Sequence, residues 1–399
     1  MSYIYTLQNR TLTCTTILYC CFTLMPLSRT LPDVIKAIIL LFIVLLGFYG
    51  STIDKRSSTT FVCLTVVICI LNLIIYIGEY ESKGDFAFYS KYFMMYMFWF
   101  PFLLGNIYIK SNNHRNILKI KKVIMLFLCI TTLSTLVGIY LFDDPCRALA
   151  SGNVMLNRYY QMRNIGGYGF IYALTLSIPW LIYQYKERKN RRIILCCILF
   201  IFCIIKSSYT TAILIMLCNL FVSYFLFIKR KMLSFCAFSF VAIFLVVCIF
   251  NNEFWLFILK FLHNDIILRE RISNLRDLFV FGSLNGDIHF RWRLYEVSII
   301  AFFHNPLFGN LFALSPRLLG YHSEMLDLLG GTGILGITIL LLVLIRIYSV
   351  YSPAYNNLRI RKYYLLAIVV IIFFSFVNTV FGSIELSAIL AFLYLPEKQ

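Results

Sequence analysis

Long runs of apolar residues, separated by short polar stretches, set the pattern of this chain. A helix that crosses a bilayer needs about 20 largely apolar residues, because its backbone groups must hydrogen-bond within the segment. By that rule the pattern predicts twelve membrane-spanning helices, the first of them a retained span and not a removed signal peptide. They are expected near 11–27, 34–52, 60–79, 88–109, 120–142, 165–184, 192–207, 209–228, 232–250, 328–348, 361–380 and 383–396. The seventh and eighth are so close that a tight hairpin must join them.

One long stretch, residues 251–327, interrupts the succession of spans. Its first part, 252–262, is apolar on most faces yet too short to span, which predicts a helix lying in the membrane interface. An amphipathic helix follows, with apolar residues spaced by three or four at Leu268, Ile272, Leu275 and Phe279. We expect this second helix to pack on the bundle as a lid that has no chemistry of its own.

A third helix in the same stretch is predicted to end before Pro306, because proline cannot continue a helix and restricts the residue before it. Its apolar stripe is expected at Trp292, Tyr295, Ile299 and Phe302, with Arg291 on another face. The predicted fold is an all-α polytopic membrane protein of one structural domain. It consists of a nine-helix region at 1–250, a long loop of short amphipathic helices at 251–327, and a three-helix region at 328–399.

Composition agrees with a membrane protein. The chain is 60% hydrophobic and only 14% charged, whereas a soluble domain carries about 25% charged residues. Of the 13 cysteines, nearly all fall inside apolar runs, so neither a disulfide framework nor a metal site is predicted. No metal and no cofactor is expected.

The formal net charge of +18 is explained by topology, because positively charged short loops stay cytoplasmic. Lysine and arginine collect in the loops after even-numbered spans, as in Lys186–Arg192. This predicts cytoplasmic termini, an outward-facing 251–327 stretch, and no binding of nucleic acid.

By this topology several charged residues from distant parts of the chain lie on the outer side. They are Arg158, Arg163, Lys206, Arg291, Arg293, His322, Glu324, Asp327 and Glu385. A charge near an apolar helix end costs up to about 3 kcal/mol unless it faces protein or water. Each arginine alone could instead reach the lipid headgroups; for the whole set we favour a shared polar cavity.

The stretch YHSEMLDLLGGTGILG, residues 321–336, opens the tenth span. Its glycines, among them Gly333 and Gly336, allow another helix or a ligand to approach the backbone closely. Histidine as a side-chain type titrates near pH 6.5, which suits a general base, and arginine suits bidentate phosphate contact. His322 and the outer-side arginines are therefore candidate catalytic residues, although ordinary helix packing and an interfacial histidine would account for the same residues.

This stretch resembles the signature of the O-antigen polymerase and O-antigen ligase superfamily. In that signature a histidine is followed by Asn, Ser or Gln, nine residues, Gly, two residues, and Gly, Thr or Tyr. Four positions fit it: His322, Ser323, Gly333 and Gly336. Upstream, Arg291, Tyr295 and Pro306 resemble the family's arginine, aromatic residue and proline, and Arg163 stands ahead of a glycine-rich span as the family's arginine often does.

One position departs from the family. Members often carry an arginine in the Ser/Thr-rich turn that opens the eighth span, and Tyr209 stands there in this chain. Lys206 could replace it, although an ammonium group is a point charge and lacks the guanidinium fork.

The resemblance implies a glycosyltransferase of the bacterial inner membrane with a periplasmic active site. Its substrate would be a glycan on undecaprenyl diphosphate, surrounded by membrane lipids, and its partners would include the chain-length regulator and flippase of the pathway. In the implied chemistry, Arg291 and Arg163 stabilise the leaving diphosphate, and His322 is the base, oriented by Glu324 or Asp327. Arg293, Lys206, Arg158 and Tyr209 complete the substrate site.

Three alternatives stay open. An O-antigen ligase would transfer the glycan to the lipid A core, whereas a polymerase, which we favour, would transfer it to a second lipid-linked repeat unit. A transporter or flippase of lipid-linked sugars would have basic residues deep in several spans and two related halves, and the sequence has neither. A membrane scaffold would not concentrate histidine and arginine on one face.

Overall fold

The chain is all-helical wherever its structure is described. The computed structural model describes residues 2–51, 63, 66–67, 70, 87–111, 114–149, 154–225, 247–261, 266–283, 286–311, 318–352 and 358–396. In chain order the helices are α1 (Ser2–Leu24), η1 (Pro26–Thr30), α2 (Asp33–Ser51), α4 (Ala87–Ser111), α5 (His114–Leu141), α6 (Pro145–Ala148), α7 (Val154–Met162), α8 (Tyr168–Arg188), α9 (Arg191–Lys206), α10 (Thr210–Phe225), α12 (Asn252–Phe261), α13 (Ile266–Phe281), α14 (Gly286–His304), α15 (Glu324–Tyr351), α16 (Leu358–Val377), α17 (Ile384–Ala388) and η3 (Ile389–Leu393). Within these ranges there is no strand, and the all-α prediction is confirmed.

Three of the described helices are long and apolar enough to cross a membrane, namely Arg115–Leu141, Glu324–Tyr351 and Ile360–Val377. Shorter apolar helices cover Ile38–Gly47, Thr210–Phe225 and Ile384–Leu393. These helices support a membrane-embedded protein. The predicted spans at 60–79 and 232–250 fall largely outside the described residues, and the number of twelve stays a prediction.

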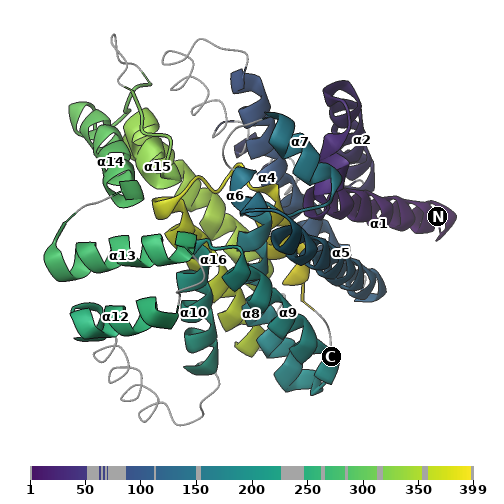
Figure 1. The fold of residues 1–399 in the computed structure, drawn as a ribbon. Coiled ribbons are helices and arrows are strands. Elements are labelled where there is room, and N and C mark those ends of the chain that lie inside the picture. The colour runs from purple at the N-terminus through teal and green to yellow at the C-terminus, as the bar shows by residue number, and fades with distance from the viewer. Residues whose placement is uncertain are drawn as a thin grey trace.

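The core forms around two helices that are enclosed on every side. In α8, every residue from Phe170 to Leu181 is buried, and the same holds from Ile384 to Leu393 in α17 and η3. A helix that is apolar all round must lie inside a bundle. Figure 1 shows α8 beside α9 and α16, with α1 and α2 at the far edge of the molecule from α12 and α13.

The predicted hairpin between the seventh and eighth spans is present. Only Ser207, Ser208 and Tyr209 separate α9 from α10, and Ser208 has a left-handed φ of 55°. All three residues are buried. The turn therefore lies inside the protein at one end of the bundle.

The long stretch between the spans forms the three short helices α12, α13 and α14, as predicted. In Figure 1, α12 and α13 lie one below the other at the edge of the bundle next to α10, and α14 leads to α15. On α12, Leu256, Phe257 and Phe261 are exposed, which fits a helix in the membrane interface. The last helix, α14, ends at His304, just before Pro306.

The packing face of α14 differs from the predicted stripe. The helix packs on α15 through Ser298 and Ala301, each 1% exposed, whereas Trp292 is 56% and Ile299 36% exposed. A Cβ added to Gly330 of α15 would lie 2.7 Å from the Ser298 carbonyl oxygen. Small residues thus let the two backbones approach, and a search for large apolar residues overlooks that contact.

Candidate functional site

A cavity of about 240 Å³ opens between α10, α13, α14 and the end of α16. Two arginines line it, Arg271 from α13 and Arg291 from α14, together with Thr210 and Thr211 of α10. The other lining residues are Leu214, Asn274, Leu275, Leu278, Trp292, Tyr295 and Val377. Two cations beside mostly apolar walls suit a ligand that combines an anionic group with a hydrocarbon chain.

Arg291 is held by contacts to the end of α16. Its Nη1 donates to Oδ1 of Asn378 at 3.3 Å, and Nδ2 of Asn378 donates to the Tyr172 hydroxyl at 3.1 Å. One helical turn along α14, the Tyr295 hydroxyl donates to the Val377 carbonyl at 2.7 Å. Burial raises the pKa of the Tyr295 phenol, while the neighbouring Arg291 cation opposes that rise. Tyr295 therefore keeps its proton and fixes α14 beside α16.

Arg271 was missed by the sequence analysis. Its Nη1 donates to the Ser208 carbonyl at 3.4 Å, so its guanidinium lies at the turn that opens α10. This is the turn in which the family resemblance implies an arginine. The same cavity is lined by Asn274, Leu275 and Leu278, which follow Arg271 by three, four and seven residues. This helical spacing indicates that Arg271 lies on the same helix face as these three residues.

His322 lies in the short segment that leads into α15. Its ring is half-buried and meets the ring of Phe290 edge-on, with 6.4 Å between the ring centroids. Phe290 directly precedes Arg291 on α14, so His322 packs against the turn of helix that carries this arginine. The next residue, Ser323, caps α15 by accepting the Leu326 backbone N–H at 3.2 Å.

Asp327 shapes the turn on which His322 sits. Its Oδ1 accepts the Ser298 hydroxyl at 2.6 Å and the Tyr321 backbone N–H at 3.1 Å. Tyr321 has a left-handed φ of 55°, which a non-glycine residue adopts only when its surroundings enforce it. Ser298 also accepts the Gly320 backbone N–H at 2.9 Å. The Asp327 carboxylate thus fixes His322 through the preceding backbone.

Glu324 ties the start of α15 to the segment between α16 and α17. Its Oε2 accepts the backbone N–H groups of Val380 at 3.0 Å and Phe381 at 3.3 Å. Its own backbone N–H donates to the Asn378 carbonyl at 3.3 Å. Glu324 and Arg291 therefore both donate hydrogen bonds to Asn378.

The remaining predicted site residues lie elsewhere in the described structure. Arg163 stacks on the Tyr159 ring, 3.5 Å from its centroid, and donates to the Tyr159 carbonyl. Arg158, Arg163, Lys206 and Arg293 are exposed, and within the described part of the chain none of them lines the cavity. The Tyr209 hydroxyl donates to the Cys146 carbonyl at 2.7 Å, and its ring packs on Tyr168 and Tyr172. Of the predicted cations within the described part of the chain, Arg291 alone lines this cavity.

No group of three or more His, Cys, Asp or Glu side chains that could hold a metal ion lies within the described ranges. Comparisons with protein-family models, curated proteins and solved structures found no match for this chain. The superfamily resemblance therefore stays a prediction based on the residues 291–336.

Proposed function

We propose that this protein polymerises glycan repeat units carried on undecaprenyl diphosphate, on the periplasmic face of the bacterial inner membrane. The observation that carries the proposal is a cavity lined by both Arg271 and Arg291, with the His322 ring packed on Phe290, the residue before Arg291. Apolar walls from α10 and α13 suit a polyprenyl chain, and the two guanidinium groups suit its diphosphate.

The proposed reaction needs one proton acceptor and cationic stabilisation of the leaving group. The His322 imidazole takes the proton from an acceptor hydroxyl, whose oxygen bonds to the anomeric carbon of the donor glycan. The bond between that carbon and the diphosphate oxygen breaks at the same time. Undecaprenyl diphosphate leaves as an anion, and Arg271 and Arg291 stabilise the charge that develops on it.

The test is a gel of surface glycan from cells that lack this protein. A polymerase predicts a single repeat unit on the lipid A core, whereas a ligase predicts bare core with accumulated lipid-linked polymer. A flippase predicts that lipid-linked repeats stay on the cytoplasmic side. Unchanged long-chain polysaccharide would refute the proposal in each of these forms.

The same gel tests the base. The His322→Ala variant should lose long-chain polysaccharide at normal protein level, because removing a general base lowers the rate by about 10²–10⁴-fold. His304→Ala is the matched control, since His304 is exposed at the other end of α14. Wild-type chain length in His322→Ala would remove the assigned role.

A further inference from the structure

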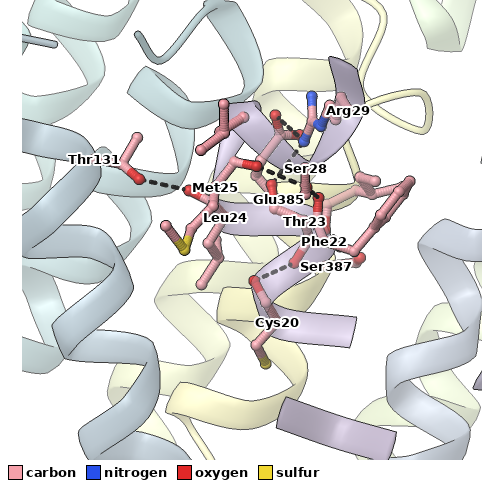
Figure 2. A network of polar contacts seen from close by, with 12 residues as sticks. Cys20, Phe22, Thr23, Leu24, Met25, Ser28, Arg29, Thr131, Glu385 and Ser387 are labelled. Atoms are coloured by element: carbon pink, nitrogen blue, oxygen red, sulfur yellow. Dashed lines mark hydrogen bonds and ion pairs between the residues drawn. The ribbon is translucent and has the colours of Figure 1, made fainter. Parts of the chain in front are cut away.

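Apart from the Arg271–Arg291 cavity, a largely buried ion pair joins the N-terminal and C-terminal parts of the chain. Arg29 of η1 and Glu385 of α17 approach to 2.6 Å, and their side chains are 23% and 5% exposed. The same Nη2 of Arg29 donates to the Thr23 carbonyl at 2.7 Å. Figure 2 shows Arg29 and Glu385 facing one another, with Ser28 and the carbonyls at the end of α1 around them. Within this pair the two charges cancel.

A cavity of about 170 Å³ lies beside the pair. Besides Arg29 and Glu385, its polar lining includes Gln161, Tyr168 and Ser383. At one point of the wall the carboxylate lies close to the backbone, since a Cβ on Gly169 would lie 2.5 Å from Oε2 of Glu385. The cavity is thus built around the carboxylate.

The polar groups of this wall include both donors and acceptors. The Gln161 amide and the Ser383 hydroxyl can each donate and accept a hydrogen bond, and the Glu385 carboxylate accepts. The Nε of Arg29 has no hydrogen-bond partner among the described residues, but this atom is closed off from the cavity. A ligand that offers both hydroxyl donors and acceptors matches the wall.

The chemistry of this cavity differs from that of the Arg271–Arg291 cavity. Its cation is already neutralised by Glu385, so a second anion would gain little there. An amide, a serine hydroxyl and a tyrosine ring accompany the ion pair, which suits a neutral polyol with a C–H face. One sugar ring therefore suits this polar lining better than a lipid does.

Contacts connect the two cavities. The Tyr168 ring meets the Tyr172 ring at 4.4 Å between centroids. The Tyr172 hydroxyl accepts from Asn378, which in turn accepts from Arg291. One layer of aromatic side chains thus separates the two cavities.

We infer that the cavity beside Arg29 and Glu385 binds one neutral sugar ring of the glycan substrate. That the sugar belongs to a lipid-linked glycan rests on the proposed function. The binding of the ring itself rests on this cavity alone.

The test uses the purified full-length protein and two probes. The first probe is the producing cell's own surface polysaccharide, hydrolysed to short oligosaccharides; the second is undecaprenyl diphosphate. Binding is measured as the ligand-dependent rise in Tm. Gly382→Leu should raise the Kd for the oligosaccharide about tenfold or more, because Gly382 lines the cavity and a Cβ there meets open space. Gln161→Leu should also weaken oligosaccharide binding, and both variants should bind undecaprenyl diphosphate as the wild type does.

Two further variants complete the design. Gly382→Ala adds one methyl group and should bind the oligosaccharide within about twofold of wild type. Arg271→Ala should weaken only the binding of undecaprenyl diphosphate. If Gly382→Leu proves unstable without ligand, Gln161→Leu decides. The inference is overturned if the wild type shows no oligosaccharide binding, or if both cavity variants retain it. If the wild type does not bind undecaprenyl diphosphate, the proposed function is refuted, but the inferred sugar site is not.

Discussion

Arg291 and Arg293 of α14 are two residues apart, yet their surroundings differ. Successive residues of a helix are turned by about 100°, so these side chains leave α14 on nearly opposite faces. Arg291 lines the cavity and bonds to Asn378, whereas Arg293 is exposed. The chain thus supplies a matched pair of residues with the same charge on the same helix.

Arg291→Ala should lower the rate of glycan polymerisation by about 10²–10³-fold, the usual cost of removing one group that stabilises developing negative charge. Arg293→Ala should stay within a few-fold of wild type. The rate is measured with membranes that contain equal amounts of each variant, as consumption of lipid-linked repeat units. Equal effects of the two substitutions would show that only the net charge of α14 matters.

Arg271 allows the same comparison on α13, where Arg269 is exposed. Arg271→Ala should reduce the rate strongly, and Arg271→Lys should restore only part of it, since an ammonium group cannot make the bidentate contact of a guanidinium. Arg269→Ala is the control. Full activity of Arg271→Lys would mean that a point charge suffices, and full activity of Arg271→Ala would remove this residue from the site.

At the scale of elements, the glycines of α15 bring a loop and a helix together by backbone contact. Gly333 has φ +61° and interrupts the helical geometry. At this interruption the backbone N–H groups of Ile334 and Leu335 donate to the carbonyls of Pro306 and Leu307. From the loop, the Asn310 N–H donates back to the carbonyls of Gly330 and Gly331. The end of α14 is thereby fixed to the helix that begins just after His322.

Gly309→Ala tests this contact. Gly309 has φ +57°, and an added Cβ would lie 2.5 Å from the Gly330 carbonyl oxygen. The left-handed backbone costs a non-glycine residue about 1–2 kcal/mol, and forced overpacking adds about 1–3 kcal/mol. Gly282→Ala is the control, because Gly282 has a similar φ of +66° and no atom within 4 Å of the added Cβ. In SDS unfolding titrations Gly309→Ala should lose clearly more stability; equal losses would leave backbone strain as the only cause.

Sequence periodicity predicted the elements well and their contacts less well. The α9–α10 hairpin, the end of α14 before Pro306 and the close approach at Gly333 follow from local residue properties. The role of Arg271 does not, because it depends on α13 lying beside the turn at Ser208, a contact between residues distant in sequence. For the same reason the bond from the Tyr321 backbone N–H to the Asp327 carboxylate could not be predicted from the sequence. That Glu324 or Asp327 orients the imidazole stays a prediction.

At the scale of the whole molecule, the segments predicted for the outer side contact one another. Arg29 pairs with Glu385, Tyr209 bonds to the Cys146 carbonyl, and Arg271 bonds to the Ser208 carbonyl. Segments predicted for the inner side also meet, since Nζ of Lys121 donates to the Leu395 carbonyl at 2.6 Å. The alternation of the spans itself stays a prediction. Which end faces outward rests on the placement of lysine and arginine.

Reporter fusions test that orientation. Alkaline phosphatase folds only where its disulfides form, outside the cytoplasm, so a fusion after Ser283, beyond α13, should be active. A fusion after Asn190, between α8 and α9, should be inactive, because the basic residues around it hold this loop in the cytoplasm. β-Galactosidase fused at the same two positions should give the opposite pattern and serves as the control. Phosphatase activity at Asn190 and none at Ser283 would place the Arg271–Arg291 cavity in the cytoplasm, where a periplasmic polymerase could not use it.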